Sequence, residues 1–110
     1  MNENKKVGPK RALNPHWLVM QKYDEEMLGK CTEWRESIMA HEAIPVKYKE
    51  LIMVSMCSVI RFEAGIKVHA QYAIEEGATK DELFGAIALS LLIGGVPAYR
   101  EGVMTLNEIF

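Results

Sequence analysis

Residues 46–60 read VKYKELIMVSMCSVI and decide the fold class of this chain. Pro45 stands directly before them, at a position where proline favours the first turn of a helix. As a helix, this segment would carry Leu, Ile, Met and Val on nearly all of its sides, which is typical of a helix buried at the centre of a protein. The chain shows no alternation of apolar and polar residues that would indicate strands. The sequence therefore predicts an all-α fold built around this helix.

Helix signals continue on both sides of the central segment. Asn14-Pro15 marks a helix start, and residues 17–39 read as one broken helix or as two helices. On the other side, residues 64–76 form a third predicted helix, which stops at Gly77 because glycine accepts the backbone conformation that ends helices. These signals place the central helix between helical neighbours.

The last third of the chain carries its own start and stop signals. Thr79 and Glu82 form a capping box, in which the threonine side chain and the glutamate side chain each bind the other residue's backbone N–H. The helix that begins there ends at Gly94-Gly95, and Pro97 begins a last helix to about residue 109. In total we expect five or six helices.

Composition limits the classes of protein to consider. The 110 residues are 49 % hydrophobic and 25 % charged, which predicts one globular helical domain over residues 14–110 after a flexible tail, residues 1–13. The net charge of −2 offers no basic face for nucleic acid. The longest apolar run, residues 86–96, is shorter than the roughly 20 residues that cross a bilayer. The first 20 residues also lack the apolar core of a signal peptide. We expect a cytoplasmic protein without nucleic-acid or membrane partners.

Polar residues gather directly after the central helix, in the segment RFEAGIKVH, residues 61–69. At about 100° per residue, Glu50, Cys57 and Arg61 lie on one face of the central helix. If the next helix packs antiparallel through a short turn, Glu50 and Cys57 approach His69. A histidine can donate or accept a proton near neutral pH, and an arginine can bind a carboxylate by two parallel hydrogen bonds. The same cluster could instead be a structural network that satisfies its own members.

The two cysteines, Cys31 and Cys57, form no CxxC pair and no cluster with histidines. A zinc site is therefore not expected. Taken alone, Cys57 is also consistent with a small buried hydrophobic residue.

The span from Lys49 to Tyr99 resembles the carboxymuconolactone decarboxylase family, which includes the alkyl hydroperoxidase D-like proteins. The resemblance is carried by the KEL glutamate, the histidine 19 residues later, the EEGATKDEL turn and the GGVPA segment. It implies an all-helical fold that assembles as trimers or hexamers, with a site near the histidine.

The hydroperoxidase D-like branch has the pattern E-x11-C-x2-C-x3-H, with the cysteine pair as its redox centre. In this chain the glutamate falls on Glu50 and the histidine on His69, but the cysteine positions hold Phe62 and Gly65. A thiol–disulfide cycle needs one thiolate to attack and a second thiol to resolve, so this cycle is not expected. A one-cysteine peroxidase through Cys57, with an outside resolving thiol, is a remaining alternative.

The decarboxylase branch resembles the chain better, because its members commonly lack the cysteine pair. The resemblance implies a cofactor-free enzyme that removes CO2 from a small carboxylated lactone, with His69 as the proton donor and Arg61 holding a carboxylate. Gly65 would leave room for a ligand beside the imidazole, and Phe62 would form an apolar wall. Glu63 is either a further member of the site or an acid at the helix N-terminus. The alternative is a non-redox member that binds a small acid or serves as an assembly subunit.

The composition of the last helices gives a separate prediction, that the chain associates with itself. Their small residues permit close helix packing, and the seven methionines suit adaptable apolar contacts. We expect a homo-oligomer. The small residues are Gly85, Ala86, Ala88, Gly94 and Gly95.

Overall fold

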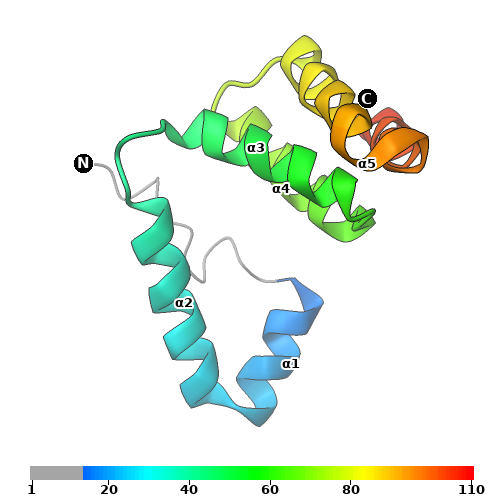
Figure 1. The fold of residues 1–110 in the computed structure, drawn as a ribbon. Coiled ribbons are helices and arrows are strands. Elements are labelled where there is room, and N and C mark those ends of the chain that lie inside the picture. The colour runs from blue at the N-terminus through cyan, green and yellow to red at the C-terminus, as the bar shows by residue number, and fades with distance from the viewer. Residues whose placement is uncertain (1–13) are drawn as a thin grey trace. The chain divides into compact units, whose positions relative to one another are not determined.

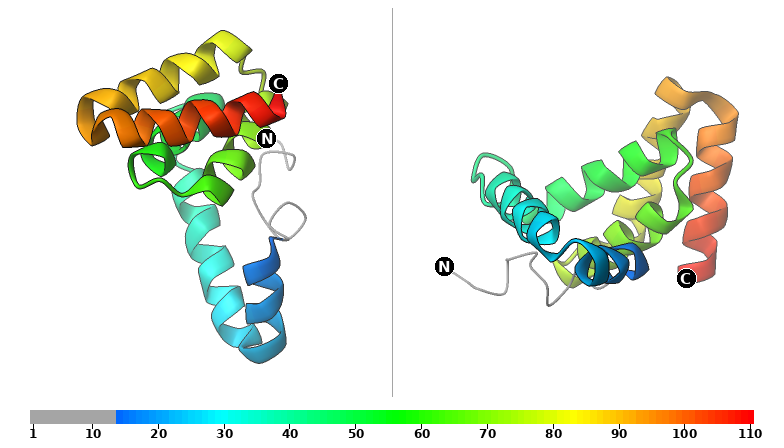
Figure 2. Two further views of the ribbon diagram at one scale, coloured as in Figure 1. Left: turned by 90° about the vertical axis from the view of Figure 1, so that its right-hand side faces the viewer. Right: turned by 90° about the horizontal axis from the view of Figure 1, so that it is seen from below.

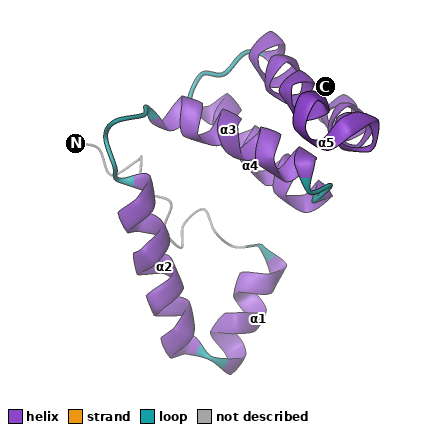
Figure 3. Ribbon diagram, in the orientation of Figure 1, coloured by secondary structure: helices purple, strands orange, loops and turns teal. Residues whose placement is uncertain are grey.

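The computed structural model describes residues 14–110, and over this range every regular element is a helix (Figures 1 and 3). The helices are α1 (Pro15–Tyr23), α2 (Glu25–Met39), α3 (Val46–Val59), α4 (Glu63–Glu75) and α5 (Lys80–Ile109). The all-α prediction is confirmed, and the stretch over residues 17–39 proves to be two helices. The predicted tail, residues 1–13, lies outside the described residues.

The described residues fall into two units, divided between Ala43 and Ile44. The first unit contains α1 and α2, which pack against each other. Asp24 separates them and caps α2, because its side chain accepts a hydrogen bond of 3.1 Å from the backbone N–H of Met27. Neither helix has a buried residue of its own. A single domain over residues 14–110 stays a prediction.

The second unit contains α3, α4 and α5, and α3 packs against both of the others. Figures 1 and 2 show α3 and α4 running antiparallel through a short turn. The buried apolar side chains of the unit form one cluster: Leu51, Val54, Ile66, Ala70, Ala73, Leu83, Ile87 and Leu106. The expectation that α3 is central is correct for this cluster, but the helix is not covered all round. Ile52 and Met56 are about half exposed, because α4 and α5 pack on the opposite side of the helix.

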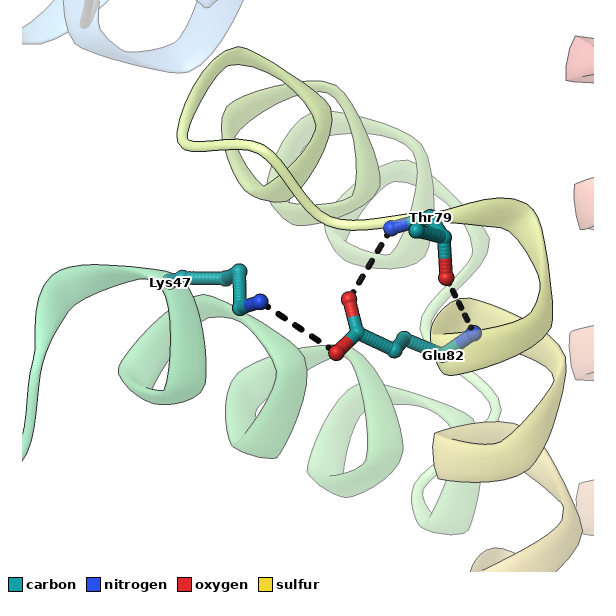
Figure 4. A network of polar contacts seen from close by, with 3 residues as sticks. All are labelled: Lys47, Thr79 and Glu82. Atoms are coloured by element: carbon teal, nitrogen blue, oxygen red, sulfur yellow. Dashed lines mark hydrogen bonds and ion pairs between the residues drawn. The ribbon is translucent and has the colours of Figure 1, made fainter.

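The predicted capping box is present at the start of α5 (Figure 4). The hydroxyl of Thr79 accepts a hydrogen bond of 3.0 Å from the backbone N–H of Glu82, and the Glu82 carboxylate accepts one of 3.0 Å from the backbone N–H of Thr79. The second carboxylate oxygen of Glu82 binds Lys47 of α3 at 3.2 Å. This contact joins the start of α5 to the start of α3.

Helix α5 is interrupted at Gly95, whose φ of 79° and ψ of −175° are not helical. The chain reverses there, so the two parts of α5 lie antiparallel (Figure 2). A methyl group on Gly102 would lie 2.6 Å from the Ile87 side chain, so glycine is needed where the two parts meet. The predicted stop at Gly94-Gly95 and restart at Pro97 are therefore correct.

A buried serine pair holds this reversal against α3. The Ser58 hydroxyl donates a hydrogen bond of 2.7 Å to the carbonyl oxygen of Ala98, just after the reversal. The Ser90 hydroxyl donates one of 2.6 Å to the carbonyl oxygen of Ile87, and the two serine oxygens are 3.3 Å apart. Both hydroxyls are buried and have partners, so they serve the packing of α5 on α3.

By length and composition alone, α5 is the one described helix that could cross a membrane. The reversal at Gly95 divides it into two parts, and each is shorter than the roughly 20 residues that span a bilayer.

Candidate functional site

The turn between α3 and α4 brings the candidate site together. The backbone N–H of Arg61 binds the carbonyl oxygen of Ser58 at 3.0 Å, and that of Phe62 binds the carbonyl oxygen of Cys57 at 2.8 Å. Arg61 adopts a φ of 57°, which is uncommon for a residue other than glycine. This tight turn reverses the chain at once, so the polar face of α3 meets α4.

The central contact of the site joins Glu50 of α3 to His69 of α4. Glu50 Oε1 lies 2.7 Å from His69 Nδ1. The glutamate side chain is 1 % exposed and the histidine side chain is 26 % exposed. When the carboxylate is ionised, Nδ1–H donates to it and Nε2 is left for other partners. The predicted approach of these two residues is confirmed.

The second oxygen of Glu50 distinguishes this pair from a closed structural network. Oε2 is buried and has no hydrogen-bond partner within residues 14–110. Buried polar atoms nearly always have a partner, so an unpaired carboxylate oxygen in a fully buried side chain needs an explanation. A group that receives or delivers a proton beside His69 is one such explanation.

Three predicted site residues pack together at the α3–α4 turn. A methyl group on Gly65 would lie 2.7 Å from the Sγ of Cys57 and 2.6 Å from Cδ2 of the Phe62 ring. The space that we expected Gly65 to leave for a ligand is therefore filled by this thiol and this ring. Only glycine fits at position 65 without displacing them.

The environment of Cys57 keeps its thiol protonated. Burial raises the pKa of the Cys57 thiol, and the negative charge of Glu50 raises it further. A thiol reacts with peroxides and disulfides as its thiolate, so a raised pKa lowers its reactivity near neutral pH.

Two predicted residues lie away from the histidine. Arg61 is exposed on the turn and makes no side-chain hydrogen bond or ion pair with any residue in the described range. His69 lies about two turns into α4, whereas Arg61 lies on the turn before that helix. Glu63 is in the first turn of α4 and pairs with Lys67 at 3.5 Å, as expected of an acid at a helix N-terminus.

One neighbour of His69 was not predicted. The ring of Tyr72 lies edge-on to the imidazole, with 5.9 Å between the ring centroids. The two residues are three positions apart on α4, and such residues are neighbours on a helix surface. That spacing of three residues was the signal in the sequence that could have predicted the contact.

The described part of the chain holds no group of three or more His, Cys, Asp or Glu side chains that could bind a metal ion. The chemistry that these residues offer is proton transfer at His69.

Comparison with known protein families identifies the fold. The model of the carboxymuconolactone decarboxylase family matches residues 25–107, which is well over half of the chain. The chain belongs to the carboxymuconolactone decarboxylase family. It is a helical member that lacks the cysteine pair, since its two cysteines are 26 positions apart and both are free. The chain matches none of the curated proteins with which it was compared.

Proposed function

We propose that the protein is a cofactor-free decarboxylase that acts on a small carboxylated lactone or a related acid, with His69 as the proton donor. The observation that carries the proposal is the Glu50–His69 pair, in which a buried carboxylate holds a partly exposed imidazole at 2.7 Å. Family membership supports chemistry of this type. The substrate class rests on that membership and not on a recognised ligand.

The reaction breaks the bond between a carbon atom and a carboxylate. CO2 leaves, and the electron pair of that bond remains on the substrate as an enolate-like carbanion. A proton must then be delivered to carbon. Nδ1 of His69 is held by Glu50, so Nε2 of the imidazolium delivers the proton and the ring is left neutral. Glu50 fixes the orientation of the ring.

The position of Arg61 sets a condition on the substrate. The guanidinium is free to bind a carboxylate by two parallel hydrogen bonds. Because Arg61 lies on the turn before α4 and His69 lies two turns into that helix, one compact lactone ring reaches both only if the long arginine side chain extends toward the histidine. In this proposal Arg61 binds a carboxylate remote from the protonated carbon.

The alternative is a non-redox family member that binds a small acid or serves as an assembly subunit. We also propose a homo-oligomer, a trimer or a hexamer, located in the cytoplasm. A one-cysteine peroxidase is disfavoured, because burial and Glu50 both raise the pKa of the Cys57 thiol. Peroxide treatment at neutral pH should leave Cys57 unmodified, and rapid oxidation measured by mass spectrometry would restore the redox alternative.

The deciding experiment measures CO2 release and the ultraviolet absorbance of carboxymuconolactone with the wild type and His69→Ala. We expect turnover that is lost in His69→Ala and kept in His41→Ala, which removes an exposed histidine of the other unit. Circular dichroism and light scattering show whether each variant keeps its helices and its assembly. Loss of folding or assembly in His69→Ala would make the histidine structural. An inactive but folded wild type would remove this lactone and favour the binding or assembly role.

A further inference from the structure

Decarboxylation creates a negative charge that Glu50, His69 and Arg61 do not neutralise in the proposed function. When the bond to the carboxylate breaks, its electron pair moves onto a carbonyl oxygen in conjugation with that carbon, and the intermediate is an enolate. Hydrogen-bond donors held ready for such an oxygen are usually the largest single contribution to catalysis. His69 gives its proton to carbon, and the ionised Glu50 carboxylate is only an acceptor. The enolate oxygen therefore needs a further donor close to the imidazole.

Three donors near the site are poorly placed for this oxygen. The Cys57 thiol is a weak donor, and its sulfur packs toward Gly65, where a methyl group would lie 2.7 Å from it. Arg61 lies on the turn before α4, whereas His69 lies about two turns into that helix. Lys67 is roughly 200° around α4 from the histidine, and it is held in ion pairs of 3.5 Å and 3.1 Å with acids of α4 and α5.

The phenol of Tyr72 is a donor beside the histidine. Tyr72 follows His69 by three positions on α4, and residues at this spacing are neighbours on a helix surface. The two ring centroids are 5.9 Å apart, with an angle of 80° between the ring planes, which is an edge-on contact of two rings. Both residues are partly exposed. A ligand that reaches the imidazole from solvent can therefore also touch the tyrosine.

We propose that Tyr72 is a catalytic residue, whose hydroxyl donates a hydrogen bond to the enolate oxygen; this role rests on the proposed function. The carbon–carbon bond breaks, CO2 leaves, and the electron pair passes to the carbonyl oxygen, which becomes negative. Tyr72 keeps its proton and shares it with that oxygen in a hydrogen bond to a charged acceptor, which is stronger than one to a neutral carbonyl. Nε2 of His69 then protonates the carbon, the carbonyl forms again, and the neutral imidazole takes a proton from water.

This role narrows the class of substrate. The carboxylate that leaves must be on a carbon that is conjugated with a carbonyl group, either directly or through a double bond. Only such an acid places negative charge on an oxygen that Tyr72 can bind. Because the hydrogen bond strengthens as the charge develops, it lowers the barrier more than it tightens the binding of the substrate.

The kinetic test compares wild type with Tyr72→Phe, which removes the hydroxyl and keeps the ring. Tyr48→Phe is the matched control, since Tyr48 lies roughly 160° around α3 from Glu50. With carboxymuconolactone we expect Tyr72→Phe to lower kcat by roughly 10²-fold, the loss expected for one donor to an oxyanion, with little change in KM. Tyr48→Phe should keep the wild-type values. An equal loss in both variants would overturn the proposal.

A binding test uses tetronic acid, a five-membered lactone that is an enolate at neutral pH, and γ-butyrolactone as its neutral counterpart. Calorimetry should show that wild type binds tetronate more tightly than butyrolactone. Tyr72→Phe should weaken tetronate binding by roughly 10- to 100-fold, as expected for one hydrogen bond to a charged group. The affinity for butyrolactone should change much less, and Tyr48→Phe should change neither.

A spectroscopic measurement keeps the test decisive if Tyr72→Phe fails to fold. With 3-fluorotyrosine at position 72, the fluorine-19 resonance should shift when tetronic acid binds, and the same label at position 48 should not respond. Bound tetronate with an unshifted signal at position 72 would overturn the role of Tyr72.

The outcomes separate this role from the proposed function. Turnover by wild type, with kcat and tetronate affinity unchanged in Tyr72→Phe, would overturn the role of Tyr72 and leave the decarboxylase. A folded wild type that neither consumes the lactone nor binds tetronate would overturn both. Tetronate binding that Tyr72→Phe weakens, without turnover of the lactone, would support Tyr72 as the oxyanion donor and remove carboxymuconolactone as the substrate.

Discussion

Glu50 and Glu82 are both glutamates of the second unit that join two helices. They differ in how many of their carboxylate oxygens have a hydrogen-bond or ion-pair partner. Glu82 is partly exposed, and each of its oxygens has a partner, Thr79 for one and Lys47 for the other (Figure 4). Glu50 is buried, and only one of its oxygens has a partner, the Nδ1 of His69. A carboxylate near water whose two oxygens both have partners contributes to the stability of the fold. A buried carboxylate oxygen without a hydrogen-bond partner instead lowers the free energy of unfolding. The difference supports the proposed role of Glu50 beside His69.

The largest effect that we expect from this difference between Glu50 and Glu82 is on turnover. Glu50→Gln keeps the shape of the side chain, but a neutral amide no longer balances the charge of the imidazolium at His69. We expect kcat/KM to fall by roughly 10²-fold, the scale of general acid–base catalysis, while Glu82→Gln leaves it unchanged. The measurement is the lactone absorbance assay with both variants at equal folded concentration.

The contact between Glu50 and His69 can also be tested without a substrate. Nitrogen-15 NMR of His69 should show Nδ1–H in the wild type, and the Nε2–H form should become populated in Glu50→Gln because the amide can donate to Nδ1. Full turnover in Glu50→Gln, with an unchanged tautomer, would make Glu50 a structural residue like Glu82.

A smaller effect is expected from two glycines of the second unit, Gly65 and Gly77. Gly65→Ala brings a methyl group to 2.6 Å from the Phe62 ring and 2.7 Å from the Cys57 Sγ. Overpacking of this kind should lower the free energy of unfolding by about 1–3 kcal/mol. Chemical denaturation measures it. In a Phe62→Ala, Cys57→Ala background both obstructing groups are gone, so the same change should become neutral or stabilise by up to about 1 kcal/mol.

Gly77, two residues before Thr79, provides the contrast. It has no neighbour within 4 Å of the position of a side chain, but its φ is 96°. Gly77→Ala should therefore destabilise through its backbone by about 1–2 kcal/mol, and substitution of neighbouring side chains should not rescue it. If the Phe62→Ala, Cys57→Ala background fails to rescue Gly65→Ala as well, packing at the site is not what requires glycine.

The helices and the central pair of the site could be predicted because their causes are local in sequence. Proline, glycine and the capping box mark where helices begin and end, and the reversal at Gly95 follows from two such signals. Glu50 and His69 could be paired because two antiparallel helices joined by a short turn bring only certain faces together. Family membership then confirmed the resemblance seen in the KEL, EEGATKDEL and GGVPA segments.

The details beyond that pair depend on side-chain conformations that spacing does not determine. The space beside Gly65 was expected to be open, but the rotamers of Phe62 and Cys57 fill it. Arg61 lies on the same wheel face as Glu50, yet its positive φ ends the helix there, so its side chain starts from a turn at the end of α3. The apolar residues of α3 predicted that this helix is buried on all sides. Composition alone could not show that α4 and α5 cover only one side of α3.

The smallest predicted effect returns to Glu82 and concerns pH. The backbone N–H of Thr79 and the ammonium group of Lys47 both lower the pKa of the Glu82 carboxyl below its ordinary value of 4.5. A lowered pKa in the folded state means that Glu82 contributes stability above about pH 4.5, and that this contribution is lost as the pH falls through the lowered value. Glu82→Gln should therefore flatten the acid side of the melting temperature profile and slightly lower the melting temperature at neutral pH. Thr79→Ala is the control that removes only the hydroxyl half of the capping box; the backbone N–H of residue 79 and Lys47 still lower the pKa of Glu82, so most of the pH dependence should remain. A profile that is identical in wild type and Glu82→Gln would show that the completed carboxylate contributes nothing measurable, and the contrast with Glu50 would then rest on burial alone.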